Sequence, residues 1–204
     1  MSPNDLLAAF VLFFAVIDPI GTVPVFIAVT RGYEAADKRK IAIRATLISA
    51  AVLLFFVVAG ELILTAIDIP LSAFQVAGGI VLFLFALTMI FGESKPDEEL
   101  KLAKNATETA IFPLSIPSIA SPGAMLAAVM LTENSRFKLI EQVQISAMML
   151  SVLVVVCVLL LAASSIHRLI GTSGASIISR IMGLILAAVA VSSVLSGIRT
   201  YFGL

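Results

Sequence analysis

The chain has 204 residues, of which 60% are hydrophobic and 13% are charged, and its mean hydropathy is +1.14. Soluble domains contain about 25% charged residues, and a chain of this length cannot hide so much apolar surface from water. The formal net charge is zero, which argues against the basic surface of a nucleic-acid-binding protein. The composition therefore predicts a protein embedded in the lipid bilayer, with no nucleic-acid partner.

Six predominantly apolar stretches are long enough to cross the bilayer as helices, because a span needs about 20 residues. They cover about 6–30, 41–63, 73–92, 111–132, 143–166 and 181–202. The residues before the first stretch include no basic residue, whereas a cleavable signal peptide begins with a positive region, so we expect the first stretch to be retained. The sequence predicts an all-α membrane protein with six transmembrane helices in a single domain, 1–204.

The charged residues collect between these stretches, and the distribution of Lys and Arg predicts their orientation. The loops after the first, third and fifth stretches hold ten of the 13 basic residues. The opposite side holds the other three, Arg136, Lys138 and Arg199. The basic loops, including the link at about 93–110, are therefore predicted to be cytoplasmic. Both termini are then expected on the outer (periplasmic) side of the inner membrane.

Landmarks in the two halves of the chain recur at a nearly constant spacing. The stretches 78–92 and 183–197 are both bounded by glycines and lie 105 positions apart, while Pro19 and Pro122 lie 103 apart. This recurrence favours a duplicated three-helix unit, with repeat A at about 1–95 and repeat B at about 108–204. An odd number of spans per unit makes the second copy enter from the opposite face, as in many secondary transporters. The alternative is chance recurrence of glycine and proline in apolar sequence.

The first and fourth stretches contain prolines, which are disfavoured inside a helix. The first holds DPIGTVP at 18–24, and the fourth holds Pro113, Pro117 and the sequence SPG at 121–123. Lipid cannot satisfy the backbone groups that such breaks free, so breaks occur where they are buried in protein or line a wet cavity. At about 1.5 Å per residue, both breaks fall near the midplane of a hydrocarbon core about 30 Å thick.

The two breaks predict a binding site. Half-helix N-termini present N–H groups to a carboxylate, and unwound carbonyls suit an ammonium, Na⁺ or a proton-carrying group. Asp18 is the one acid that we place deep in a span, where a charge is costly unless it is satisfied; the alternative is that it only caps the half-helix beginning at Pro19. The predicted site residues are Asp18, Pro19, Gly21, Thr22, Pro24, Ser121, Pro122 and Gly123.

Four segments resemble sequence signatures of the MarC family of bacterial and archaeal membrane proteins. They read FFAVIDPIGTVPVF at 13–26, VAGGIVLFLFALTMIFG at 76–92, FPLSIPSIASPGAM at 112–125 and SRIMGLILAAVAVSSVLSGI at 179–198. The resemblance extends over nearly the whole chain. It implies a six-span inner-membrane protein related to transporters of small neutral amino acids.

These observations favour a secondary transporter of small zwitterionic solutes that works by alternating access. There is no P-loop motif for ATP and no nucleophile–base pair, so neither ATP-driven transport nor an enzyme is expected. We expect no cofactor and no metal, and a coupling ion, H⁺ or Na⁺, is left open. The alternative is a membrane scaffold or regulatory protein without transport activity. The expected partners are a small solute and the bilayer, with a homo-oligomer left open.

Overall fold

The structure is a computed structural model that describes residues 1–91, 108, 110–134 and 136–203. The predicted link at 93–110 therefore lies almost entirely outside the described residues. No strand occurs in the described part of the chain, which agrees with the predicted all-α class. The elements in chain order are α1 (Pro3–Ile17), α2 (Pro19–Val29), α3 (Ala35–Ala66), α4 (Leu71–Phe91), the π-helical segment η1 (Ala110–Ile119), α7 (Pro122–Leu131), α8 (Leu139–Leu161) and α9 (Ala163–Phe202).

Most of these helices are long and apolar enough to cross a bilayer. Five spans qualify within the described residues: α1 and α2 taken together, α3, α4, α8 and the part of α9 from Ser176 onward. η1 and α7 add a sixth when they are counted as one span that bends by 56°. The chain is accordingly a multi-pass membrane protein.

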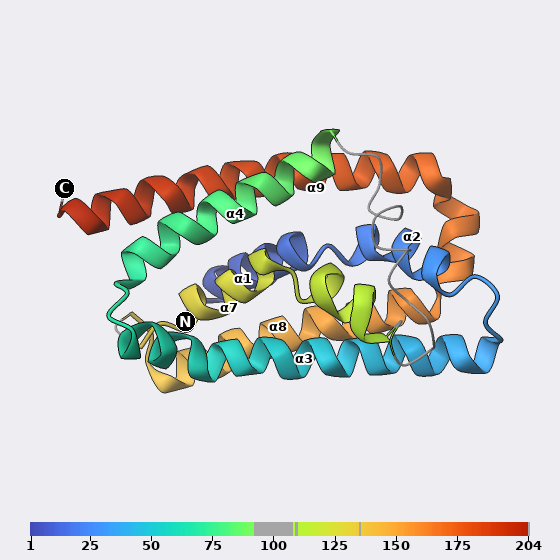
Figure 1. The fold of residues 1–204 in the computed structure, drawn as a ribbon, viewed down its shortest axis with the longest axis horizontal. Helices are drawn as coiled ribbons and strands as arrows, with labels where there is room; N and C mark the ends of the chain where they lie inside the picture. Colours follow the sequence, from blue (N-terminus) through green and yellow to red (C-terminus); the bar gives the residue numbers. More distant parts are fainter. Residues whose placement is uncertain (92–107, 109, 135, 204) are drawn as a thin grey trace.

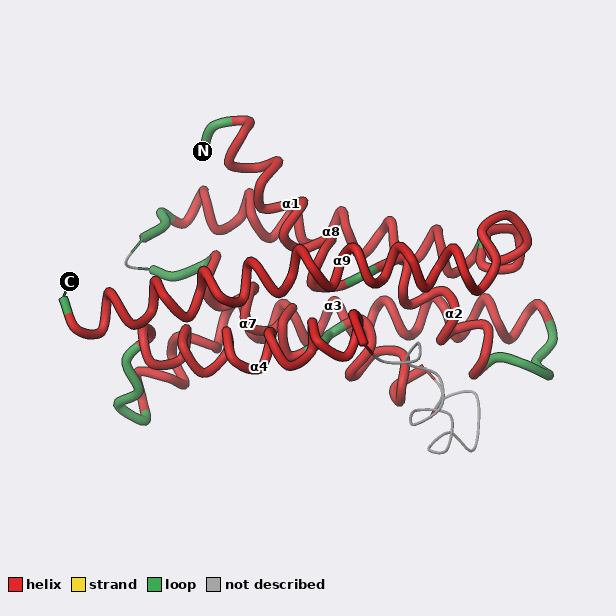
Figure 2. The backbone as a smooth tube through the Cα atoms, turned by 90° about the horizontal axis from the view of Figure 1, so that it is seen from above, coloured by secondary structure: helices red, strands yellow, loops and turns green. Residues whose placement is uncertain are grey.

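The helices lie in three layers (Figure 1). α4 and α9 run side by side along one face, and Figure 2 shows the same pairing from above. α3 and α8 form the opposite layer, and the shorter elements α1, α2, η1 and α7 lie between the two. The core runs through this middle layer, where Phe13, Ile17 and Leu114 are fully buried. The interruptions at Asp18 and Ser121, which are at most 1% exposed, are thereby kept away from lipid, which could not satisfy their freed backbone groups.

Glycines bring α4 and α9 together closely. A Cβ built on Gly79 of α4 would lie 3.0 Å from the carbonyl oxygen of Ala190 in α9. A Cβ built on Gly183 of α9 would likewise lie 3.0 Å from the carbonyl oxygen of Ala86 in α4. Small residues at such contacts allow membrane helices to pack backbone against backbone. Gly78, by contrast, faces the Leu126 side chain of α7.

The observed helix ends differ from the predicted ones most clearly between the last two spans. The predicted fifth stretch, 143–166, corresponds to α8, which ends at Leu161, and α9 begins at Ala163. α9 turns at the end of the bundle and then returns along α4 (Figure 1), so the predicted stretch 181–202 is only its last part. Hydropathy marks the part of a helix that lipid surrounds, whereas the helix itself continues wherever its backbone hydrogen bonds are made.

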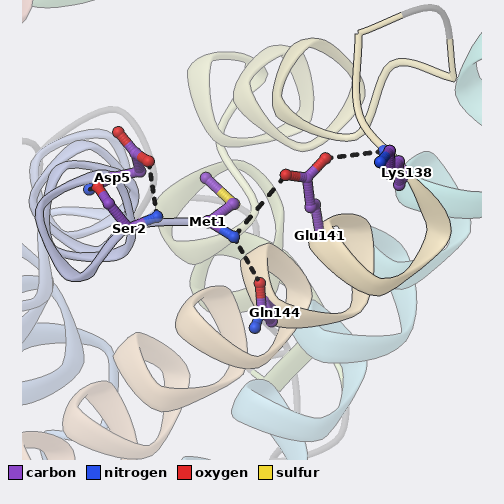
Figure 3. A network of polar contacts seen from close by, with 6 residues as sticks. All are labelled: Met1, Ser2, Asp5, Lys138, Glu141 and Gln144. Atoms are coloured by element: carbon purple, nitrogen blue, oxygen red, sulfur yellow. Dashed lines mark hydrogen bonds and ion pairs between the residues drawn. The ribbon is translucent and has the colours of Figure 1, made fainter.

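The start of α1 is held against the start of α8 (Figure 3). The N-terminal ammonium of Met1 lies 3.7 Å from Glu141 Oε1 and donates to Gln144 Oε1 at 3.5 Å. Glu141 Oε2 also accepts the backbone N–H of Lys138 at 2.9 Å, which caps α8. Both termini lie at the same end of the molecule (Figure 1). Which side of the membrane this end faces stays a prediction.

Candidate functional site

The first break consists of a single residue, Asp18, between the end of α1 at Ile17 and the start of α2 at Pro19. Asp18 has φ 50° and ψ 66°, a left-handed conformation in which Asp and Asn are enriched among non-glycine residues. Its N–H donates to the carbonyl oxygen of Phe14 at 3.0 Å, and its Oδ1 accepts the N–H of Gly21 at 3.0 Å. Asp18 is 1% exposed. The break therefore buries a carboxylate at the start of α2.

The residues after Asp18 are shaped around its side chain. A Cβ built on Gly21 would overlap Oδ2 of Asp18 and lie 2.6 Å from its Cγ, so only glycine leaves room for the carboxylate. Thr22 Oγ1 donates to the carbonyl oxygen of Asp18 at 3.0 Å. Pro19 is buried at the first position of α2, whereas Pro24 is half-buried inside α2, which continues through it. Pro24 thus adds no second break to the first span.

The second break lies at Ser121, which caps α7 by accepting the N–H of Ala124 at 3.1 Å. Ser121 is fully buried, Gly123 is buried, and Pro122 is exposed. Extended conformations occur at Ser121 and, within η1, at Phe112 and Ile116. Each of these three residues precedes a proline, and proline disfavours the helical conformation of the residue before it. Proline spacing therefore explains why the fourth span is irregular before α7 begins.

A hydrogen bond joins the two breaks. The hydroxyl of Ser121 donates to the carbonyl oxygen of Val16 at 2.9 Å. Val16 lies in the last turn of α1, where carbonyls have no partner within the helix. The capping residue of the second break thus satisfies a carbonyl that the first break frees. The sequence predicted both breaks, and the structure brings them into contact.

Three buried serines that the sequence analysis did not select extend this polar region toward α3. Ser118 Oγ lies 3.5 Å from Thr22 Oγ1, and Ser115 Oγ donates to the carbonyl oxygen of Ala45 at 3.0 Å. Ser49 Oγ lies 3.4 Å from the carbonyl oxygen of Ser115. The sequence could have identified these serines as candidates, because each is a polar residue inside an apolar stretch. Ser118 therefore joins the two breaks in one polar centre, formed by Asp18, Thr22, Ser118 and Ser121. Ser115 and Ser49 instead connect η1 to α3.

The polar centre offers groups for both signs of charge. The carboxylate of Asp18 suits a cation, and the first turn of α7 suits an anion. In the first turn of α2, by contrast, the N–H groups of Gly21 and Thr22 are already bonded to Asp18. The key side chains are closed off in this structure, since Asp18, Thr22 and Ser121 are at most 1% exposed. Among the described residues, no cluster of His, Cys, Asp or Glu could hold a metal ion. A solute would reach this centre only after the surrounding helices move.

Comparison with known proteins agrees with this architecture. The sequence profile described as "MarC family integral membrane protein" matches residues 4–202. The chain is 36% identical to a UPF0056 membrane protein of Methanocaldococcus jannaschii, over 98% of each chain. It is 34% identical to the UPF0056 inner membrane protein YhgN of Escherichia coli, over 97% of this chain and 98% of the relative.

A third relative, the UPF0056 membrane protein YvbG of Bacillus subtilis, is 34% identical over 95% of this chain and 93% of its own length. These names describe membrane proteins and mention no enzyme activity. No solved structure matches the chain. The match to the family profile and to relatives along the whole chain shows that this protein belongs to the MarC family of integral membrane proteins.

Proposed function

We propose that this protein is a secondary transporter of the cell inner membrane that carries small zwitterionic solutes, such as neutral amino acids, by alternating access. The observation that supports this most strongly is the contact of the two helix breaks, in which Ser121 bonds to Val16 two residues from the buried carboxylate of Asp18. Broken helices that meet inside a membrane protein are typical of transporter binding sites. The amino-acid class of the solute rests on the family resemblance alone.

Many transporters that work by alternating access are built from two repeats of similar structure, and contacts between α4 and α9 support such a relation between repeat A (about 1–95) and repeat B (about 108–204). Gly79 approaches the carbonyl of Ala190, and Gly183 approaches the carbonyl of Ala86. Adding 104 to positions 79 and 86 gives 183 and 190, so the two contacts are the same contact with the halves exchanged. A two-fold relation between the halves produces this reciprocity.

The main contacts of the four middle-layer elements with the two outer layers have the same reciprocity. α8 packs on α1 and α2, and α3 packs on η1 and α7. α2 packs on α9, and α7 packs on α4. Exchanging α1 with η1, α2 with α7, α3 with α8 and α4 with α9 converts each of these contacts into another that is present. We infer an inverted repeat of two three-helix units, with one break near the membrane midplane in each unit.

The chemistry of the two breaks suggests how a zwitterion would bind. The start of α7, at Ser121, Pro122 and Gly123, would bind the carboxylate through the N–H of Gly123, because Pro122 has no N–H and the cap already uses the next one. Asp18 and the last carbonyls of α1 would bind the ammonium. A charge at this depth is costly unless it is neutralised, and a bound ammonium, Na⁺ or H⁺ would neutralise Asp18. Coupling to H⁺ or Na⁺ is part of this proposal.

The experiment that tests the proposal is solute flux in proteoliposomes. Purified protein is reconstituted, and uptake of radiolabelled small neutral amino acids is compared with empty liposomes and with Asp18→Asn. The matched control is Asp68→Asn, because Asp68 also has a left-handed backbone (φ 55°) but is exposed in the turn between α3 and α4. Saturable flux in the parent and in Asp68→Asn, lost in Asp18→Asn, supports the proposal. The absence of flux for every zwitterion tried, with correctly inserted protein, would favour the scaffold alternative.

A further inference from the structure

A cavity of about 370 Å³ is lined by residues of α2, α3, α8 and α9, whose ends meet at the end of the bundle opposite the termini (Figure 1). At this end α2 leads into α3, and α8 leads into α9. A volume of this size falls in the range of about 300–1,000 Å³ found for small-molecule sites. Its apolar wall includes Phe26, Ile27, Leu160 and Leu161.

The same cavity is lined by two cations, Lys38 and Arg39, near the start of α3. Lys38 is half-buried and Arg39 is exposed, and within the described residues neither forms an ion pair. Two acids lie nearby in the sequence. Asp37 pairs with Lys40 at 3.0 Å, and Glu34 precedes the helix without capping it through its side chain. Because the Glu34 side chain does not cap the helix, the first-turn N–H groups of α3 add to the positive potential of the two cations.

We propose that this cavity binds an anionic phospholipid, with its phosphate at Lys38 and Arg39 and an acyl chain along the apolar wall. The cavity combines a cationic part with a hydrocarbon part, and an anionic lipid combines the same two parts. Basic pockets between transmembrane helices are known to bind anionic head groups. A free phosphate would leave the apolar wall uncovered, and a zwitterionic lipid would leave the cations without a net counter-charge. The proposed lipid site stands independently of any transport activity.

The test uses the full chain in a neutral detergent. Phosphatidylglycerol, phosphatidylcholine and inorganic phosphate are added in turn, bound ligand is counted by native mass spectrometry, and melting is followed by circular dichroism. Phosphatidylglycerol is expected to bind and to raise the melting temperature, and the other two are not. Lys38→Gln combined with Arg39→Gln should weaken phosphatidylglycerol binding about thirtyfold, since each cation near an anionic lipid contributes about fivefold.

Two further variants separate a built site from general surface charge. Arg31→Gln combined with Arg180→Gln removes the same charge from residues that do not line the cavity and should leave the affinity as in the parent. Ala35→Phe keeps both cations but fills the cavity from an exposed position, and should abolish lipid binding without changing the lipid-free melting temperature. Equal weakening by both charge pairs, unchanged binding in Ala35→Phe, equal binding of phosphatidylcholine, or the same stabilisation by inorganic phosphate would overturn the proposal.

Discussion

The two halves of the chain interrupt a helix in the same way but with different chemistry. In both, the residue before a proline caps the next half-helix by accepting the N–H three positions later, at 3.0 Å for Asp18 and 3.1 Å for Ser121. Ser121 does this with a neutral hydroxyl in an extended conformation, and Asp18 with a carboxylate in a left-handed one. Capping needs only an oxygen. The negative charge of Asp18 therefore exceeds what capping requires, and this excess supports the proposed binding of a cation or a proton.

The glycines near the two breaks also differ, because one lies against a charged group and the other against an apolar side chain. Gly21 leaves space for the carboxylate of Asp18, which cannot move without losing its hydrogen bond. Gly123 leaves space for the end of the Leu82 side chain, which can rotate away. The first break is thus constrained around a charged group, and the second around an adaptable apolar one.

The largest effect is expected where the two halves are most alike. Gly79→Leu and Gly183→Leu would each force a side chain against a backbone carbonyl of the partner helix. Overpacking a well-packed core costs about 1–3 kcal/mol, and the cost here should exceed that range because a helix backbone cannot move aside as a side chain can. We expect both variants to lose folded protein to a similar degree, measured by yield and by melting in detergent. Gly78→Leu, which faces the movable Leu126 side chain, serves as the milder control. Two variants that accumulate and melt like the parent would refute the close packing of α4 on α9.

The next largest effect on stability should differ between the two halves of the chain. Gly21→Ala should destabilise the protein by about 3 kcal/mol, because the methyl group displaces a carboxylate from its hydrogen bond in a buried site. Gly123→Ala should stay within about 1 kcal/mol of the parent, since Leu82 can move and alanine favours the helix. The measurement is the free energy of unfolding of both variants and of the parent in the same detergent. Equal values for the two would show that the halves do not differ at their glycines.

A smaller loss is expected for Ser121→Ala. It removes the cap of α7, worth about 1 kcal/mol, and the donor to the buried carbonyl of Val16, worth about another 1 kcal/mol. Ser2→Ala is the matched control, because Ser2 also caps a helix but is exposed. Its effect should be about half as large in the same unfolding experiment. If the two substitutions destabilise the protein equally, the hydrogen bond between the breaks contributes nothing to stability.

The elements that could be predicted from the sequence are those set by local chemistry. Apolar length predicted the spans, and the prolines after Asp18 and Ser121 predicted the positions at which α2 and α7 begin. The conformations at Phe112 and Ile116 follow from the same proline rule, although the sequence analysis did not apply it to them. Each of these features depends on residues within a few positions of one another.

The remainder depends on contacts between distant residues. Nothing local to Val16 indicates that its carbonyl accepts a hydrogen bond from a residue 105 positions away. The buried serines Ser49 and Ser115 could be seen as polar residues in apolar sequence, but their meeting depends on how α3 packs on η1. The early start of α9 was missed because hydropathy does not register a helix that continues through polar residues. Tertiary packing decides these features. Contacts between distant residues leave no local pattern in a single sequence, so they could not be predicted from it.

The most direct test of the central claim, that the Asp18 charge serves binding, is solute flux against pH for the parent and Asp18→Asn in the same liposomes. Asparagine caps as well as aspartate and is equally enriched in the left-handed conformation, so the variant should fold and insert normally, with little change in stability. Our account predicts that the parent transports and that Asp18→Asn transports at no pH, while Asp68→Asn behaves as the parent. Coupling to H⁺ would in addition make the flux of the parent depend on pH, whereas coupling to Na⁺ would not. Equal flux of Asp18→Asn and the parent at every pH would contradict it and reduce Asp18 to a helix cap.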